Sequence, residues 1–360
     1  MEPVTFWQRG AEKENLGLGI RNPTMDDVAR RAGVSKATVS RVINGVEGAA
    51  ATETVDRIMA AVDELGYVVN AVAASLKSGK VSTAGLIVPD ASEPFFGAVT
   101  SGVESVLRGA GLTLLLANTN NDVTLERKIV RLLLERQIHA IIIAPSSNES
   151  SHLTDAQERG VTLVTVSSTV SGLDCDSVTV DDEAASYSAV RRLVELGHQR
   201  IGIITGPLAT SADKERLAGY RNCLLESGIQ VHDQLMVTGD FTIESGRQAM
   251  RKLLEARPEP SAVFVTADNM TLGALSVLHN EGIVVPRDMS VVCWDDLESY
   301  AFCDPPITAI AQPGFELGAE AAERLRLRLT LAQQPASRTK VLSTTFRQRA
   351  STTSPPMLLR

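Results

Sequence analysis

The sequence predicts a small all-α helix-turn-helix head followed by an α/β body built from two doubly wound parallel-sheet lobes. Residues 24–44 combine two short amphipathic helical patterns with a Gly-Val-Ser turn between them. From Val81 onward, short apolar runs alternate with amphipathic helical patterns, which is typical of parallel strands covered by helices on both faces. These units are too many for one small sheet, and 360 residues leave room for a head and a bilobed body.

The first two helices and their turn are predicted from the spacing of small and apolar residues. Val28, Ala29 and Ala32 fall on one face of the first helix. Gly33 stands where a helix end accepts a left-handed residue, and Ser35 stands where the next helix needs an N-cap oxygen. The pattern therefore predicts a helix-turn-helix, with an ordinary helical hairpin as the alternative.

The second helix, expected over Lys36–Asn44, has one apolar and one polar face. Its buried face is predicted to contain Val39, Val42 and Ile43. Its outer face is predicted to contain Lys36, Ala37, Ser40 and Arg41. The motif has more basic than acidic residues, whereas the whole chain has a net charge of −8. A basic surface on an acidic protein indicates nucleic-acid binding, which favours the DNA-binding interpretation over the hairpin.

The outer face of this helix suggests how it reads DNA. Lys36 and Arg41 can donate to guanine O6 and N7, and Ala37 can contact a thymine methyl group. The short polar residues suited to phosphates, which position the helix, are Thr38, Ser40 and Asn44. We also place Thr24 and Ser35, at the two helix starts, among the DNA-contacting residues. One helix reads few base pairs, so we expect a homodimer on a pseudo-palindromic operator in double-stranded DNA.

The order of elements resembles the head of the lactose-repressor/galactose-repressor (LacI/GalR) family of bacterial transcription regulators. The resemblance rests on residues 24–44, followed by Leu65-Gly66-Tyr67, Asn70 and the run Ala71-Val72-Ala73-Ala74-Ser75-Leu76. It continues nearly to the C-terminus. It implies a third helix, here Thr52–Leu65 with Thr52 as its expected cap, and a body of periplasmic-binding-protein type that senses an effector.

The resemblance also implies a hinge helix at residues 71–76. This helix is too short to be stable alone, so its partners are DNA and the same helix of a second subunit. Leu76 stands where the family inserts a Leu into the minor groove to bend the duplex. The other DNA contacts expected here are Tyr67, Asn70 and Ala73. A passive linker with a packed Leu is the alternative.

The body divides into strands and helices by its apolar pattern. The expected strands are Ala84–Val88, Leu112–Ala117, Ala140–Ala144, Val161–Val166, Arg200–Thr205, Ala262–Thr266, Ser290–Trp294 and Thr308–Ala311. The expected helices are Phe95–Ala110, Val123–Arg136, Glu183–Leu196, Asp213–Ser227, Ile243–Glu255, Asn269–Glu281 and Phe315–Ala332.

The domain boundaries follow from these patterns and from the family resemblance. We expect a flexible extension at 1–20, the helix-turn-helix domain at 21–66, and the hinge and linker at 67–80. The effector-binding and dimerisation body is expected at 81–345, with a C-terminal tail at 346–360. The first lobe would comprise about 81–180 plus 312–341, and the second about 181–311 plus 342–356.

The resemblance places an effector pocket between the lobes. Its positions fall on Phe95, Phe96, Ser146, Ser167, Arg216, Phe241, Ala267 and Asp295, with Trp294 as a further flat apolar wall. Arg216 would bind ligand oxygens and Asp295 would accept from paired hydroxyls. The alternatives are core packing for each aromatic residue and a surface ion pair for Arg216. Sugar-binding members carry Asp-Arg where this chain has Ser167-Ser168, and Asn at Ala267, so an ordinary hexose is disfavoured.

Several other classes of protein are disfavoured by the sequence. No apolar run is long enough for a membrane helix, and the first residues contain acidic groups rather than a signal peptide. The four cysteines have no metal-site spacing and are expected as reduced thiols, with a disulfide as the alternative. No catalytic Ser elbow, P-loop or dinucleotide fingerprint occurs, so we expect no enzyme activity, cofactor, catalytic residue or metal site.

The sequence therefore predicts a cytoplasmic, homodimeric, DNA-binding regulator, and a repressor is favoured. Its operator affinity would be controlled by a sugar, a sugar derivative or another small metabolite. The dimer interface is expected on the first lobe, at Phe95–Arg108 and Val123–Arg136. The alternatives are a ligand-dependent activator and a solute-binding protein of a transporter, which would have the same body but no use for the head.

Overall fold

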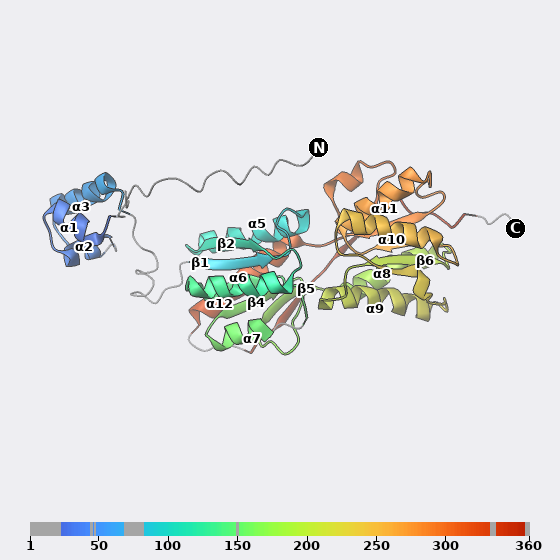
Figure 1. Ribbon diagram of the computed structural model, residues 1–360, viewed down its shortest axis with the longest axis horizontal. Helices are drawn as coiled ribbons and strands as arrows, with labels where there is room; N and C mark the ends of the chain where they lie inside the picture. Colours follow the sequence, from blue (N-terminus) through green and yellow to red (C-terminus); the bar gives the residue numbers. More distant parts are fainter. Residues whose placement is uncertain are drawn as a thin grey trace, which may run out of the picture. The chain divides into compact units, whose positions relative to one another are not determined.

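The structure of the chain, a computed structural model, is shown as a ribbon in Figure 1. It describes residues 23–43, 46, 48–67, 83–148, 151–331 and 336–356. Internal contacts divide the chain into two compact units, Met1–Gly79 and Lys80–Arg360, which we call the head and the body. Among the helices described, none is both long enough and apolar enough to cross a lipid bilayer.

The head contains the three expected helices, α1 (Met25–Ala32), α2 (Lys36–Ile43) and α3 (Thr52–Leu65). Gly33 ends α1 with a φ of 67°, and the Thr38 N–H donates to Ser35 Oγ at 3.1 Å. The predicted turn and the Ser35 cap of α2 are therefore confirmed. The last residue of the predicted second helix, Asn44, lies outside the described residues.

A small core holds the three helices together. Val28, Val39 and Ile58, one from each helix, are fully buried in it. The expectation that Thr52 caps α3 is wrong, because Thr52 is itself the first helical residue. The N-cap is Ala51, which makes no side-chain hydrogen bond, so the first turn of α3 lacks the polar cap found at α1.

The body contains two six-stranded sheets with the same strand order. The first sheet has the order β11-β5-β4-β3-β1-β2, and the second has the order β12-β10-β9-β8-β6-β7. The strands of the first sheet are β1 (Thr83–Val88), β2 (Thr113–Asn118), β3 (Ala140–Ile143), β4 (Thr162–Val166), β5 (Asp176–Val180) and β11 (Thr339–Leu342). Those of the second are β6 (Ile201–Thr205), β7 (Met236–Thr238), β8 (Ala262–Val265), β9 (Ser290–Trp294), β10 (Thr308–Ala311) and β12 (Thr345–Arg347). Among the strands that the structure describes, only β12 pairs antiparallel with its neighbour.

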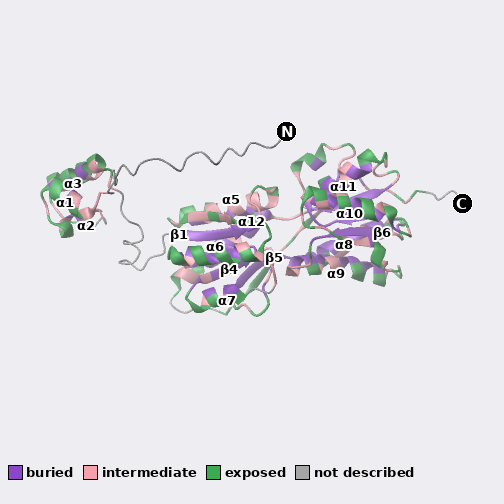
Figure 2. Cartoon of the chain, viewed as in Figure 1, coloured by how far each residue is buried: buried purple, intermediate pink, exposed green. Residues whose placement is uncertain are grey.

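Each sheet is covered by two layers of helices, which makes two lobes (Figure 1). Lobe 1 has α5 (Pro94–Gly109) and α12 (Gly314–Thr330) on one face, and α6 (Val123–Glu135) and α7 (Ser151–Glu158) on the other. Lobe 2 has α8 (Asp182–Glu195) and α9 (Ser211–Glu226) on one face, and α10 (Ile243–Glu255) and α11 (Asp268–Asn280) on the other. Two 3₁₀ turns, Asp233–Leu235 and Glu298–Ala301, complete lobe 2. Figure 2 shows buried strands between helices whose outer faces are exposed, as the predicted α/β class requires.

The chain passes between the two lobes three times. It crosses after β5 into α8, after β10 into α12, and between β11 and β12. The helix that follows each of the first two crossings packs on another helix of the lobe that it enters. These pairs are α8 with α9 in lobe 2 and α12 with α5 in lobe 1. Three connections at one place leave the lobes close together but able to change their angle.

The structure contains elements that the sequence pattern did not predict, namely β5, β7, β11, β12 and α7. The strand β5 has the sequence Asp-Ser-Val-Thr-Val, and its polar side chains are buried because they have partners. Thr165 Oγ1 donates to Ser177 Oγ at 2.8 Å, and Asp176 accepts from Arg328. The other three strands are short and lie at sheet edges, where no apolar run is needed.

The residues after β12 pack against the second sheet. Ser351 is fully buried, and its Oγ accepts from the Thr308 N–H at 2.7 Å and donates to the Val291 carbonyl at 2.6 Å. His198 is also buried, with hydrogen bonds to Ser261 and to the Thr353 carbonyl, each at 2.8 Å. Burial lowers the pKa of His198, so it is a neutral structural residue.

Candidate functional site

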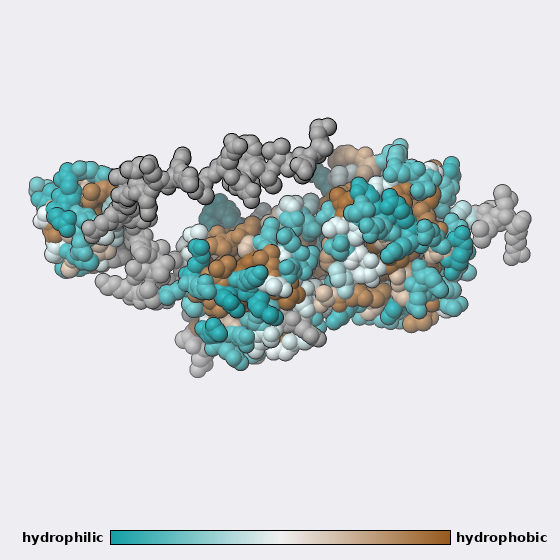
Figure 3. Space-filling view, in the orientation of Figure 1, coloured by the Kyte–Doolittle hydropathy of each residue, from teal (hydrophilic) through white to brown (hydrophobic). Residues whose placement is uncertain are grey.

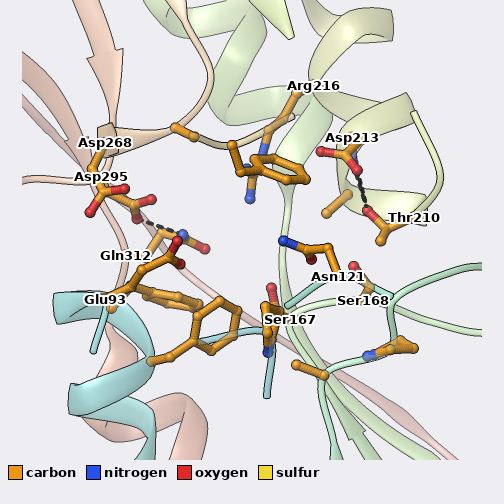
Figure 4. Close-up of a pocket in the computed structure, with 18 residues that line it drawn as sticks. Glu93, Asn121, Ser167, Ser168, Thr210, Asp213, Arg216, Asp268, Asp295 and Gln312 are labelled. Carbon is orange, nitrogen blue, oxygen red and sulfur yellow. Dashed lines mark hydrogen bonds between the residues drawn. The ribbon is translucent and has the colours of Figure 1, made fainter. Parts of the chain in front are cut away.

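A pocket lies between the two lobes, at the carboxyl ends of the parallel strands, where doubly wound folds bind ligands (Figure 4). It contains about 690 Å³ of space, part of it open to solvent. Residues that follow β1, β3, β4, β8, β9 and β10 contribute Pro89, Ala144, Ser167, Ala267, Asp295 and Gln312 to its lining. We call this pocket the cleft.

Arg216 on α9 is the basic residue of the cleft. Its Nε donates to Asp182 Oδ1 at 2.7 Å, and its Nη1 donates to the Thr266 carbonyl at 3.1 Å. The guanidinium carbon lies 4.0 Å from the centroid of the Trp294 ring, which supports a cation–π contact. Burial alone would lower the pKa of Arg216, but nearby carboxylates, Asp182 above all, outweigh burial and raise it. Arg216 is therefore a fixed cation whose tip points into the cleft in Figure 4.

Three carboxyl groups form an acidic corner of the cleft, which we define as Glu93, Asp268 and Asp295 (Figure 4). Burial, followed by the charge of Asp268, raises the pKa of Glu93 to about 7. Burial also raises the pKa of Asp295 to about 7, against the opposing effect of Arg216. Gln312 Nε2 donates to Asp295 Oδ1 at 2.7 Å. The corner is thus crowded with acidic groups that gain from a ligand that donates hydrogen bonds or carries positive charge.

The acidic corner also connects the two lobes. Asn269 Nδ2, at the start of α11 in lobe 2, donates to Glu93 Oε1, just before α5 in lobe 1, at 3.3 Å. A change in the angle between the lobes would alter this contact. A ligand in the corner would therefore meet groups from both lobes at once.

Aromatic rings form the apolar wall of the cleft. Phe95 and Phe96, at the start of α5, meet edge to face with centroids 4.9 Å apart. Phe241 reaches the cleft from lobe 2 with a φ of 69°, and its ring packs over Gly206, where a Cβ would lie 2.2 Å from Phe241 Cζ. Such left-handed non-glycine residues concentrate at functional sites. Ser167 and Asp295, with φ of 69° and 65°, share this conformation in the cleft lining.

Seven of the nine residues that the sequence assigned to the effector pocket line the cleft: Phe95, Phe96, Ser167, Arg216, Phe241, Ala267 and Asp295. The other two, Ser146 and Trp294, do not line the cleft. The Ser146 N–H donates to Glu126 at 2.6 Å and its Oγ donates to Thr119 at 3.1 Å, so it lies behind the lining. Trp294 is fully buried and supports Arg216 instead of forming a wall.

The sequence interpretation missed part of the polar lining. The residues that it did not assign include Glu93, Asn121, Ser168, Asp213, Asp268 and Gln312. Their positions carried a usable signal, because Asp268 and Gln312 directly follow Ala267 and Ala311 at strand ends. Within the described residues, no cluster of His, Cys, Asp and Glu has the arrangement of a metal site.

The head presents the other predicted surface, the outer face of α2. Lys36, Ala37 and Arg41 are exposed there, whereas Thr38 and Ser40 are half-buried. Lys36 Nζ pairs with Asp26 Oδ2 at 2.8 Å, and this hydrogen bond raises the pKa of Lys36. Arg41 Nε donates to the Ala37 carbonyl at 3.4 Å, and the guanidinium terminus makes no other hydrogen bond or ion pair within the described part of the head.

The remaining predicted DNA contacts have mixed outcomes. Thr24 caps α1 through a reciprocal pair of hydrogen bonds with Asp27, so its side chain already has a structural role. Tyr67 packs against the core of the head. The expected contacts that lie outside the described residues are Asn44, Asn70, Ala73 and Leu76, together with the hinge helix at 71–76.

Comparison with known proteins agrees with this pairing of a helix-turn-helix with a two-lobed body. Residues 24–70 match the family described as bacterial regulatory proteins, lacI family. Residues 81–347 match the periplasmic binding proteins and sugar binding domain of the LacI family. The chain belongs to the LacI family. The two matches together cover most of the chain and confirm the family resemblance proposed from the sequence.

Characterised relatives are regulators of transcription. Catabolite control protein A of Priestia megaterium is 34% identical over 305 residues, which cover 84% of this chain and 92% of the relative. The HTH-type transcriptional repressor CytR of Escherichia coli (strain K12) is 35% identical over 298 residues, which cover 83% of this chain and 87% of the relative. The chain is therefore a DNA-binding transcriptional regulator and not an enzyme.

Two solved structures show the same architecture. A lac repressor dimer bound to operator and the anti-inducer ONPF is 27% identical with a TM-score of 0.78, and the match covers 92% of this chain and 100% of the other. A complex of the transcriptional regulator CelR with cellobiose is 33% identical with a TM-score of 0.70, and covers 91% and 99% of the two chains. These matches confirm the predicted fold class.

Proposed function

We propose that this chain is a cytoplasmic, homodimeric repressor whose affinity for an operator is set by a small molecule bound in the cleft. The observation that carries the proposal is the composition of the cleft, which joins groups from both lobes next to the three chain crossings. Glu93, Phe95 and Phe96 come from lobe 1, and Arg216 and Asp295 come from lobe 2. The CelR structure holds cellobiose and the lac repressor structure holds the anti-inducer ONPF, which supports control by a small molecule.

The charges of the cleft favour a neutral polyhydroxylated ligand or a cationic one. Four lining carboxyl groups, Glu93, Asp213, Asp268 and Asp295, face one Arg216, which is already paired with Asp182. A phosphate or carboxylate group would meet repulsion in this field. The Phe rings offer flat faces to a sugar ring or a base, and the carboxyl groups accept from hydroxyl or amino groups. We therefore favour glycosides, nucleosides and amino sugars over sugar phosphates.

The DNA-binding surface proposed here is the outer face of α2 together with the hinge. Lys36, Ala37 and Arg41 would contact base edges in the major groove. Lys36 must first leave Asp26, an exposed ion pair that costs little to break. The residues assigned to phosphates, register and the hinge are Thr24, Ser35, Thr38, Ser40, Asn44, Tyr67, Asn70, Ala73 and Leu76.

A second copy of the chain would cover the edge of lobe 1. Leu116 on the edge strand β2 is 42% exposed, which is unusual for an apolar strand residue in a doubly wound sheet. An apolar area also lies over β1 and β2 in Figure 3. We propose that α5 and β2 form the dimer interface, so that the angle between the lobes sets the distance between the two heads.

The test has two steps. Thermal shift against neutral sugars, nucleosides, amino sugars and sugar phosphates identifies the effector, and selection from a random duplex pool identifies the operator. The effector should then change operator binding by the full-length protein. Tight effector binding with no change in operator affinity would contradict the proposal.

The DNA-binding assignment is tested with Arg41→Ala. We expect it to cost about 1–3 kcal/mol of discrimination at one operator position, with a smaller effect on random DNA. Arg251→Ala, an exposed arginine of α10 on lobe 2, is the control. Equal weakening on operator and random DNA would make Arg41 a phosphate contact.

A further inference from the structure

A second hollow lies on the outer face of lobe 1, between α6 and α7. It contains about 1310 Å³ of space, much of it open to solvent, and is distinct from the cleft in every lining residue. Its apolar floor includes Val130, Leu134 and Ala156. Both helices face the viewer in Figure 1, and hydrophilic atoms gather over this part of lobe 1 in Figure 3. We call this hollow the α6–α7 groove.

Basic residues dominate the walls of the α6–α7 groove. Arg127 and Arg131 lie one helical turn apart on α6 and are both exposed, and Arg159 follows α7 on the opposite wall. None of the three forms an ion pair with a described residue. The acidic residues of the groove are Glu135 and Asp155. The three arginines outnumber the two acidic residues, so the groove has a local excess of positive charge in a chain of net charge −8.

A buried histidine separates the groove from the interior of lobe 1. His152 lines the groove, and its Nε2 lies 2.8 Å from Oε1 of the fully buried Glu126. Its Nδ1 is buried and has no hydrogen-bond partner. This nitrogen could still form a hydrogen bond next to the groove. Glu126 Oε2 accepts from the Ser146 N–H, directly after Ala144 and Pro145 of the cleft lining. Groove and cleft are therefore connected through α6.

We propose that the α6–α7 groove is a second ligand site, which takes a compact organic phosphate with two or more negative charges. Two arginines one helical turn apart and a third on the opposite wall supply paired N–H donors, which bind phosphate oxygens in bidentate fashion. The apolar floor would pack against the organic part of the ligand. The cleft has the opposite charge and selects a different class of ligand, so this inference does not depend on the proposed effector.

A second copy of the chain fits this surface poorly. A two-fold axis beside α6 would place Arg127 and Arg131 opposite the same arginines of the other subunit, and like charges in contact are unfavourable. A bound anion would instead neutralise the positive charge of Arg127 and Arg131. This argument also favours α5 and β2, rather than α6, as the dimer interface.

In the experiment, pyrophosphate is titrated into the full-length protein at about 50 mM salt, where exposed charges are not fully screened. Its binding affinity is measured by isothermal titration calorimetry or by equilibrium dialysis. Arg127→Gln together with Arg131→Gln should weaken binding by roughly tenfold or more. The matched control is Lys128→Gln together with Arg136→Gln, which removes the same charge from the same helix outside the groove lining. The control should bind as the unmodified protein does, within about twofold.

Three results would overturn the proposal. Equal weakening in both double variants would mean that pyrophosphate responds only to net surface charge. Tighter pyrophosphate binding in Asp295→Asn, which removes a negative charge from the cleft and leaves the groove unchanged, would place the anion in the cleft. Absence of binding at millimolar pyrophosphate would show that the α6–α7 groove does not bind a diphosphate group. Circular dichroism of each variant checks that the fold is intact. We expect an intact fold in both double variants because their substituted side chains are exposed.

Discussion

The two lobes share one strand order but supply different chemistry to the cleft. Lobe 1 presents the aromatic pair Phe95 and Phe96 and one carboxyl group, Glu93. Lobe 2 presents one ring, Phe241, the cation Arg216 and three carboxyl groups, Asp213, Asp268 and Asp295. The sheets are equivalent, and the difference lies in the segments that follow the strands. A duplicated scaffold thus leaves each lobe free to acquire its own binding groups, because loops at strand ends carry function while the sheet carries packing.

The lobes are also equivalent in how the helix that follows a chain crossing packs on a neighbouring helix of the same lobe. At the α5–α12 crossing, a Cβ on Gly102 would lie 2.0 Å from the Phe315 carbonyl oxygen. At the α8–α9 crossing, a Cβ on Gly219 would lie 2.2 Å from the Glu183 carbonyl oxygen. Both crossings therefore depend on a glycine that lets two helix backbones approach.

The largest expected effect tests this shared feature. Gly102→Ala and Gly219→Ala should each lower the free energy of unfolding by about 3 kcal/mol or more, because the added methyl group meets backbone that cannot move aside. Gly109→Ala, in the last turn of α5 with no atom near the added Cβ, is the control and should change stability little. Denaturant unfolding measures all three. A mild effect in only one lobe would show that the crossings are not equivalent.

The next effect tests the difference between the lobes. Arg216→Ala removes the cation of lobe 2 and leaves Asp182 buried without its partner, so the effector response should be lost at a cost on the order of 2–3 kcal/mol. Phe96→Ala removes one aromatic face of lobe 1 and should weaken effector binding less, by about 1 kcal/mol. Once the effector is known, its titration against operator occupancy gives both values. An unaltered dose response in Arg216→Ala would place the sensing site elsewhere.

The smallest effect concerns pH. The pKa of Glu93 is raised to about 7 from the ordinary value of 4.5, so the folded chain keeps a proton that the unfolded chain releases. The stability of the body should therefore fall as the pH rises from about 5 to 8. Glu93→Gln should reduce the total loss of unfolding free energy between pH 5 and pH 8 by about 1 kcal/mol, after allowance for partial exposure of the side chain.

The control for the pH effect is Glu104→Gln, an exposed glutamate of α5. It should leave the slope unchanged, and thermal unfolding between pH 5 and pH 8 gives the comparison. If Glu93→Gln has the same slope as the unmodified protein, another carboxyl group of the acidic corner holds the proton.

The sequence by itself determined the head helices and the eight apolar strands, and seven of the nine pocket residues that it predicted line the cleft. The physical reason is that these features are local, because Gly33 and Ser35 fix a turn, and continuous apolar runs such as Ala140–Ile143 have one stable use in a soluble domain. The family resemblance assigned Ser167, Ala267 and Asp295 to the pocket, and their places after strand ends agree with it because strand ends converge in a doubly wound fold.

Only the tertiary structure decided which polar residues could be buried and which side chains reached the cleft. The strand β5 has a polar sequence and is stable because Arg328 pairs with Asp176 across the lobe, a contact between residues far apart in the chain. Ser146 turned away because Glu126 accepts its N–H, and Trp294 became a support because Arg216 lies over its ring. Each outcome depends on partners brought together by folding, which local pattern does not encode.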